Sequence, residues 1–202
     1  MAGILFIISS PSGGGKGTLI REVLRTVPDI GYSVSYTTRP VRDGEVDGRD
    51  YFFVAKEKFQ ELIEADEFLE YANVHDNFYG TSLNQVRRER EAGRDVILEI
   101  DVQGAELVKK KSSDAVGVFI LPPSFEILKK RLVARQTESD ETLRIRLGNS
   151  ADEVREYKKF DYVILNDDIE RAANDLRSVI FAERCRRDRQ ESAVNDILDT
   201  FE

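Results

Sequence analysis

Three glycines stand directly before a lysine in the stretch SSPSGGGKGT, residues 9–18. Glycines free backbone N–H groups to surround a phosphate, the N-terminus of a following helix adds partial positive charge, and Lys16 can bridge terminal phosphates. A plain glycine turn is the alternative, but an apolar strand, the glycines, the lysine and a helix start coincide here. The stretch therefore predicts a phosphate-binding loop, called the phosphate loop below.

The phosphate loop departs twice from the pattern G-x-x-x-x-G-K-[ST]. Ser10 stands in place of the first glycine, and Gly17 stands in place of the hydroxyl residue after the lysine. The second departure matters more, because that hydroxyl normally contacts the Mg²⁺ that accompanies a nucleotide.

Two arginines and a tyrosine form a second group with chemical potential. Arg39 and Arg42 lie three residues apart on a segment stiffened by Pro40, and Tyr51 follows in a short strand. Two planar donors and a phenol can converge on one phosphate. A solvated turn explains the segment equally well, with the arginines paired to the acidic residues Asp43, Glu45, Asp47 and Asp50.

Two carboxylates lie in the apolar run DVILEID, residues 95–101. Glu99 and Asp101 are two residues apart, so in a strand they point to one face, near the carboxyl end where parallel sheets bind ligands. They suit a magnesium shell or contacts to a substrate. A salt bridge to a neighbouring Lys or Arg is the structural alternative.

Arginines also recur around a charged helical stretch at residues 135–157, which has few apolar residues to hold it to a core. Such a segment is typical of a mobile lid, whose arginines can neutralise a transferring phosphate. An exposed helix with many ion pairs explains the stretch equally well. The arginines concerned are Arg131, Arg135, Arg144 and Arg146.

The elements that must position these residues alternate along the chain. Continuous apolar runs predict buried strands at residues 4–8, 95–101, 116–121 and 162–165, with helical spacing at 18–27, 82–92, 104–111, 125–135 and 169–187. This alternation predicts a parallel sheet wrapped by helices. Residues 30–79 break the pattern with short strands, turns and a helix at 56–65, which predicts a small inserted lobe.

Composition limits the classes of protein and partner. The 202 residues are 41% hydrophobic and 34% charged, which is ordinary for a globular chain with one sizeable core. A net charge of −8 argues against broad binding to nucleic acid or anionic membranes. Cys185 is the only cysteine, so we expect a cytoplasmic protein without disulfides, and we read His75, the only histidine, as a loop residue. The apolar run at residues 4–8 is too short for a signal peptide or a membrane span.

Taken together, the motifs resemble those of guanylate kinases. Over nearly the whole chain, SPSGGGKGTL, SVSYTTRPVRDGEVDGRDYFF, EFLEYANVHDNFYGTS, LEIDVQGA, FILPPS, KKRLVAR and LNDD follow in the family's order and spacing. The resemblance implies an α/β fold: a P-loop NTPase-type parallel sheet flanked by helices, with an inserted small α+β GMP-binding lobe and a helical lid. It implies one domain, with a core (1–36, 82–125 and 158–202), a lobe (37–81) and a lid (126–157). The implied reaction is in-line, ATP-dependent phosphorylation of GMP or dGMP to GDP or dGDP, in purine nucleotide metabolism and GMP recycling.

The resemblance also assigns site residues position by position. Glu70 has a chemical reason to contact guanine, because a carboxylate accepts from both the N1–H and the 2-amino group, whereas adenine offers no such donor pair. The implied ATP-binding residues are Ser12, Gly13, Gly14, Gly15, Lys16, Gly17, Thr18 and Asn166. The implied GMP-binding residues are Ser35, Arg39, Arg42, Tyr51, Glu70, Tyr79, Thr81, Glu99 and Asp101. Lys16, Arg131, Arg135 and Arg146 are implied in phosphoryl transfer.

Three positions depart from the family pattern. Gly17 replaces a usual serine, so we expect the Mg²⁺ cofactor to be held mainly by ATP phosphates and water, with Thr18 at the α-phosphate and no certain protein ligand. Gln136 replaces a glycine that commonly follows the lid arginine, which would stiffen lid motion. Glu99 replaces an aspartate and reaches further.

Two other functions and the oligomeric state stay open at this point. Guanylate-kinase-like domains of membrane scaffolds bind phosphorylated peptides without catalysis, but they typically lack the phosphate loop that is present here. A related kinase acting on another small phosphate is the second alternative. The amphipathic stretch SAVNDILDTF can pack on its own core or on a second subunit, so a homo-oligomer is one of two outcomes.

Overall fold

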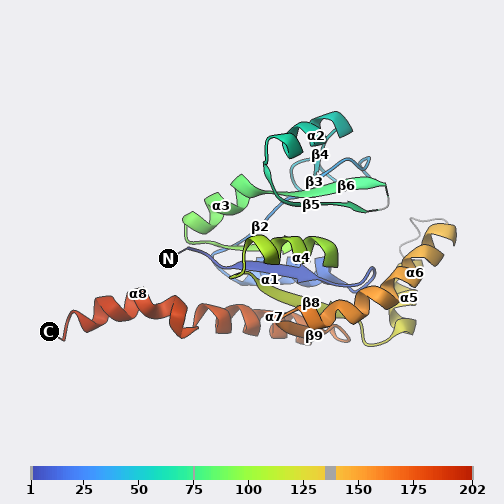
Figure 1. The fold of residues 1–202 in the computed structure, drawn as a ribbon. Helices are drawn as coiled ribbons and strands as arrows, with labels where there is room; N and C mark the ends of the chain where they lie inside the picture. Colours follow the sequence, from blue (N-terminus) through green and yellow to red (C-terminus); the bar gives the residue numbers. More distant parts are fainter. Residues whose placement is uncertain (1, 75, 135–139, 202) are drawn as a thin grey trace.

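The core of the protein is a five-stranded parallel sheet (Figure 1). The computed structural model describes residues 2–74, 76–134 and 140–201, with the backbone alone described for 140–146. The strand order is β2-β7-β1-β8-β9, in which β1 spans Leu5–Ser9, β2 Ile30–Tyr32, β7 Asp95–Glu99, β8 Val116–Leu121 and β9 Tyr162–Leu165. The predicted α/β class is therefore confirmed.

Helices cover both faces of this sheet because its strands are apolar on both sides. In β1, Phe6 and Ile8 pack with helices α1 (Lys16–Thr26) and α7 (Ile169–Arg184). Leu5 and Ile7 point the other way and pack with α3 (Leu83–Glu91) and α4 (Val102–Lys111). All four side chains are fully buried, so β1 is the centre of two hydrophobic cores.

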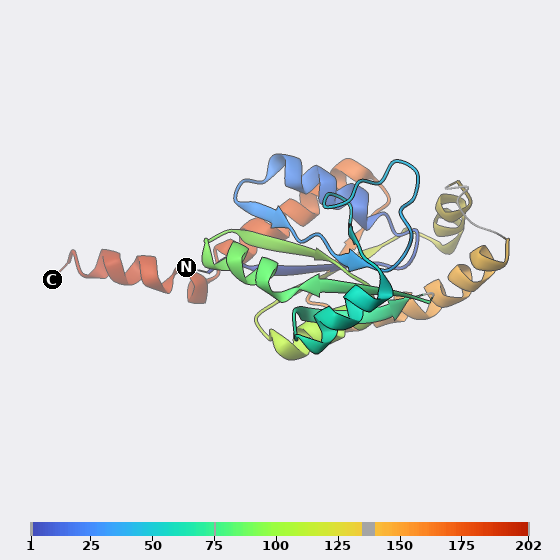
Figure 2. The same cartoon turned by 90° about the horizontal axis from the view of Figure 1, so that it is seen from above.

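A second, smaller sheet forms a lobe over one edge of the core (Figures 1 and 2). Its order is β4-β3-β6-β5, with β3 at Tyr36–Thr37, β4 at Phe52–Phe53, β5 at Phe68–Val74, β6 at Asn77–Ser82 and helix α2 at Lys56–Glu64. Phe59 of α2 stacks on Phe68 and Phe78, with ring centroids 4.6 and 5.4 Å apart. The expectation that the lobe pattern begins at residue 30 was wrong, because Ile30–Tyr32 pairs with β7 in the core sheet.

The remaining helices lie toward the two ends of the molecule (Figure 1). At one end α5 (Phe125–Ala134), α6 (Asp140–Arg155) and the 3-10 helix η1 (Glu156–Lys159) form the segment predicted as a lid. At the other end, the helix expected at 169–187 is α7, which ends at Arg184 with Cys185 as its C-cap, and a separate helix, α8 (Arg187–Leu198), follows. Helix α8 extends away from the core (Figures 1 and 2). Within the described ranges, no helix is long and apolar enough to cross a membrane.

Asp95 joins three elements of the core through one buried carboxylate. It accepts hydrogen bonds from the Ile4 backbone N–H and from Arg184 Nε, both at 2.7 Å. Asp95→Ala should lower the free energy of unfolding by about 2–4 kcal/mol, because a buried N–H and a guanidinium lose their acceptor. Urea unfolding would measure this. Lys58→Ala, which removes an exposed ion pair with Glu61, is the control and should leave the unfolding midpoint unchanged.

Candidate active site

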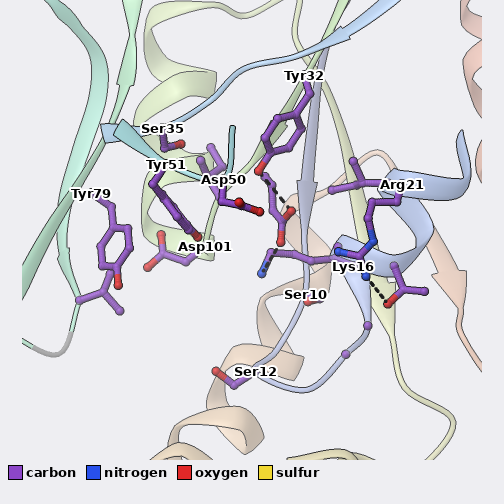
Figure 3. Close-up of a pocket in the computed structure, with 18 of the residues that line it drawn as sticks. Ser10, Ser12, Lys16, Arg21, Tyr32, Ser35, Asp50, Tyr51, Tyr79 and Asp101 are labelled. Carbon is purple, nitrogen blue, oxygen red and sulfur yellow. Dashed lines mark hydrogen bonds and ion pairs between the residues drawn. The ribbon is translucent and has the colours of Figure 1, made fainter. Parts of the chain in front are cut away.

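A cleft of about 660 Å³ separates the phosphate loop from the small lobe. It lies at the carboxyl ends of the core strands, where parallel sheets bind ligands. Lys16 and Arg21 border it on the α1 side, and Tyr51, Tyr79 and Asp101 border it on the lobe side (Figure 3). Its volume suits nucleotide-sized ligands.

The cleft brings together most of the predicted site residues. Those that line it are Ser12, Gly13, Gly14, Gly15, Lys16, Gly17, Thr18, Ser35, Arg39, Arg42, Tyr51, Glu70, Tyr79, Glu99 and Asp101. Thr81, Arg131 and Asn166 lie behind its walls, where they contact Glu70 or the phosphate loop. Arg135, Gln136 and His75 lie outside the described residues, as does the side chain of Arg146.

The phosphate loop has the backbone conformation that its glycines allow. Gly13 and Gly15 have φ angles of 84° and 89°, and Gly15 is the N-cap of α1. A Cβ on Gly15 would lie 2.3 Å from Asn166 Nδ2, so glycine is required there for space as well. The Asn166 amide donates to the Gly14 carbonyl at 2.8 Å, and Arg131 donates to the Asn166 carbonyl at 2.9 Å. These two hydrogen bonds therefore hold the backbone of the phosphate loop in this conformation.

Lys16 at the start of α1 lies beside a carboxylate at the end of β7. Its Nζ lies 3.5 Å from Glu99 Oε1, and the Tyr32 hydroxyl donates to Glu99 Oε2 at 3.4 Å. Burial, helped by Glu99, raises the pKa of the Tyr32 phenol. The sequence prediction missed Tyr32, because its strand carries no long apolar run. Its place at the carboxyl end of a core strand is the signal that could have identified it.

The lid segment contributes one described carboxylate to the phosphate loop. The Ser12 backbone N–H donates to Glu153 Oε2 of α6 at 3.0 Å. The sequence prediction considered only the arginines of this segment and missed Glu153. A carboxylate on a loop N–H occupies a donor that a phosphate oxygen would also use.

On the lobe side, the arginine segment has features of both interpretations of its sequence, the phosphate-binding group and the turn with internal ion pairs. Arg39 is buried and donates to Glu45 Oε1 at 2.7 Å, as the turn interpretation expected, and its guanidinium lies 5.4 Å from the centre of the Tyr51 ring. Tyr51 and Tyr79 meet edge to face with centroids 5.9 Å apart. Arg42 also lines the cleft. Burial, with a contribution from Glu99, raises the pKa of the Tyr51 phenol to about 12, so it remains a donor at neutral pH.

Glu70 is a buried carboxylate that faces the cleft. It comes from β5, is 5% exposed, and accepts a hydrogen bond from the Thr81 hydroxyl at 2.6 Å. Burial raises the pKa of the Glu70 carboxyl to about 7; the Thr81 hydrogen bond opposes this rise, and the nearby Asp101 adds to it. Ser35 is buried in the same part of the cleft.

The spacing of Glu99 and Asp101 predicted that both lie in one strand. For Asp101 this prediction was wrong. β7 ends at Glu99, and Asp101 is the N-cap of α4, where its Oδ1 accepts from the Gly104 N–H at 2.8 Å. Both carboxylates still line the cleft. The correction arises because a helix begins directly after the strand, so an aspartate that looked like a strand residue is used as a cap.

The donors beside the phosphate loop fit a hard cation that arrives with a nucleotide. Thr18 supplies a hydroxyl and Glu99 a carboxylate, which are oxygen ligands of the kind that Mg²⁺ prefers. Among the residues whose side chains are described, no three His, Cys, Asp or Glu side chains cluster to hold a metal by themselves. The arrangement therefore suits Mg²⁺ bound together with phosphates.

Comparison with known proteins gives one family. The guanylate kinase family model matches residues 3–183. The chain is 49% identical to a guanylate kinase of Geobacter sulfurreducens over 196 residues, which cover 97% of each protein. It is 48% identical to one from Neisseria meningitidis, over 98% of this chain and 96% of that protein. A crystal structure of guanylate kinase from Anaplasma phagocytophilum superposes with a TM-score of 0.76 at 34% identity, covering 93% of this chain and 89% of that one.

Proposed function

Because the chain belongs to the guanylate kinase family, and is thus an ATP:GMP phosphotransferase, we propose that ATP binds on the phosphate loop and GMP binds against the small lobe. The observation that carries this proposal is a single cleft with a lysine and glycine loop at one end and a buried carboxylate, Glu70, at the other. In this arrangement each nucleotide binds at one end of the cleft, and the phosphates of the two nucleotides meet in its middle.

Glu70 is the proposed reader of the guanine base. In its ionised form it accepts from the N1–H and the 2-amino group, while Thr81 holds its Oε1 in place. Ser35 and Asp101, whose Oδ1 accepts from the Gly104 N–H, line the same cleft. Adenine lacks the N1–H and 2-amino donor pair, so it would leave the carboxylate without the two ligand donors that add to Thr81, which costs far more in a buried site than at a solvated one.

The phosphate of GMP is assigned to Arg39, Arg42, Tyr51 and Tyr79. In the free protein the guanidinium of Arg39 is paired with Glu45, so a phosphate has to compete for that donor. The two phenols lie edge to face on the same wall and offer O–H donors. Planar and phenolic donors together suit an oxyanion with several acceptor oxygens.

Phosphoryl transfer then needs position and charge neutralisation more than a general base, because the attacking GMP phosphate oxygen is already an anion. Lys16 and the phosphate-loop N–H groups hold the β- and γ-phosphates, and Arg131 stands behind the loop at Gly14. Arg135 and Arg146 are proposed to neutralise the remaining phosphate charge when the lid closes. Thr18 and Glu99 would help to hold Mg²⁺ bound together with ATP, and the ion would supply charge neutralisation of the phosphates. These substrates favour a cytoplasmic site of action.

The activity is tested by one coupled assay of ADP formation from ATP, with GMP, dGMP, AMP, CMP and UMP offered in turn. GMP and dGMP should support turnover and the others should not. Turnover that does not depend on GMP would contradict the proposal. A phosphopeptide-binding module would show no turnover with any of these nucleotides. A kinase that acts on another small phosphorylated substrate would show no turnover with GMP.

The pH dependence of GMP binding should show whether the ionised Glu70 carboxylate binds guanine. Only the ionised carboxylate accepts both guanine donors, and the pKa of Glu70 in the free protein is about 7. Between pH 8 and pH 6 the affinity for GMP should therefore fall about tenfold more than the titration of the GMP phosphate explains.

Glu70→Gln is the control for this measurement by calorimetry. It should bind GMP more weakly at pH 8 and should retain only the pH dependence of the phosphate. Identical pH profiles for the two proteins would remove Glu70 from guanine recognition.

Helix α8 is the proposed site of self-association. Val194, Ile197, Leu198 and Phe201 form an exposed apolar stripe along α8 and the residues that follow it, on a segment that extends away from the core (Figure 1). Two antiparallel copies of this helix would bury the apolar stripe of each copy against that of the other.

Sedimentation velocity should detect this dimer and its loss in Ile197→Asp, because a carboxylate in the stripe would be buried without a partner. Ser192→Asp places the same charge on the opposite side of α8 and should leave association unchanged. A wild-type protein that remains monomeric at high concentration would contradict the proposal.

A further inference from the structure

Arg21 is a cation of the cleft to which the proposed function gives no role. It lies on α1, is exposed, and lines the cleft. Its Nη2 donates to the Thr18 hydroxyl at 3.3 Å, and no described residue forms an ion pair with it. Lys16 and Arg39, by contrast, each pair with a carboxylate. A guanidinium carries five N–H donors, so most of the donors of Arg21 remain available to another partner.

The facing wall of the cleft carries two carboxylates on the lobe segment between β3 and β4. Glu45 and Asp50 both line the cleft. Each Glu45 oxygen already accepts a hydrogen bond, one from Arg39 and one from a backbone N–H. Asp50 accepts from the Val46 N–H and from Arg49 Nε, at 2.8 and 2.9 Å, and both donors use its Oδ2. Asp50 therefore has a carboxylate oxygen, Oδ1, that can accept from a further cation.

Arg21 and Asp50 lie on opposite sides of the cleft. Figure 3 shows Arg21 on the α1 side and Asp50 beside Tyr51 on the lobe side. Neither a hydrogen bond nor an ion pair joins these two described residues. The hydrogen bonds from Val46 and Arg49 hold the pKa of the Asp50 carboxyl below its usual range, and the charge of Arg21 adds to this effect. The two side chains therefore attract each other across the cleft without touching.

We propose that Arg21 is a positioning residue, whose guanidinium pairs with Asp50 when the small lobe closes on GMP. This inference rests on the proposed function, because GMP on the lobe has to reach the phosphoryl donor on the phosphate loop. Bringing the two sets of phosphates together shortens the distance between the lobe and α1. The ion pair then forms only in the closed state and favours the geometry in which the nucleotides react. Arg21 acts through Asp50 and contacts neither nucleotide.

A double-mutant cycle in calorimetric GMP binding tests this pair. Arg21→Gln and Asp50→Asn should each weaken GMP binding about threefold, and the double variant should bind no more weakly than the weaker single variant, because the pair is lost only once. Arg21→Lys keeps the charge and should retain most of the affinity. Arg25→Gln is the matched control, because it removes an exposed arginine one turn further along α1, and it should bind GMP like the wild type.

Two further measurements separate positioning from a structural or an ATP-binding role. Urea unfolding without ligand should show no coupling between Arg21→Gln and Asp50→Asn, because the pair is not formed in the free protein. The affinity for MgATP should be the same in Arg21→Gln and in the wild type, because Arg21 does not contact ATP.

Three results would each overturn the inference and leave the proposed function intact. These are additive effects of the two changes on GMP binding, an equal coupling in ligand-free unfolding, and a loss of MgATP affinity in Arg21→Gln. A wild-type protein that does not bind GMP would overturn the proposed function together with this inference. The two kinds of failure are therefore distinguishable in one set of titrations.

Discussion

The geometry of the active site depends on a buried polar junction between the phosphate loop and the end of β9. Asn166 donates its side-chain amide to the Gly14 carbonyl, and its own carbonyl accepts from Arg131 of α5. Gly15 completes the junction, because its positive φ and its contact with the Asn166 amide both exclude a side chain. The loop is thus shaped before any nucleotide arrives, so binding does not have to include the cost of ordering it.

In the small lobe the constraint is different, because a carboxylate is buried in surroundings that disfavour its charged form. Stacked aromatic rings build the lobe, and Glu70 lies buried on β5, the strand that also carries Phe68, with one hydroxyl donor. A carboxylate held in this way gains most from a ligand that brings two donors of its own. Under the proposed assignment, specificity for guanine follows from the cost of leaving Glu70 without ligand donors, and a larger contact area would not provide it.

Sequence reasoning predicted the parts of the protein whose physical cause is local. VGVFIL and YVIL are the strands β8 and β9 with the expected bounds, because strands covered on both faces are continuously apolar. Ile30–Tyr32 was not separated from the lobe, because three residues give no periodic signal. The break at Cys185 was also missed, since neither Gly nor Pro marks it. The glycines and Lys16 were recognised from spacing, whereas Tyr32 and Glu153 reach the site only through tertiary contacts.

The same tertiary contacts explain how a chain with a net charge of −8 keeps a cleft for anions. Three donors assigned to phosphates already have a carboxylate partner: Lys16 pairs with Glu99, Arg39 pairs with Glu45, and the Ser12 N–H donates to Glu153. Under these proposed assignments, nucleotide binding is an exchange of partners, in which each phosphate replaces a carboxylate. Such an exchange reduces the gain from any single phosphate contact, because the broken pair is lost. It leaves the largest net gain to ligands that satisfy several of these donors at once, and two nucleotides whose phosphates meet in the cleft do so.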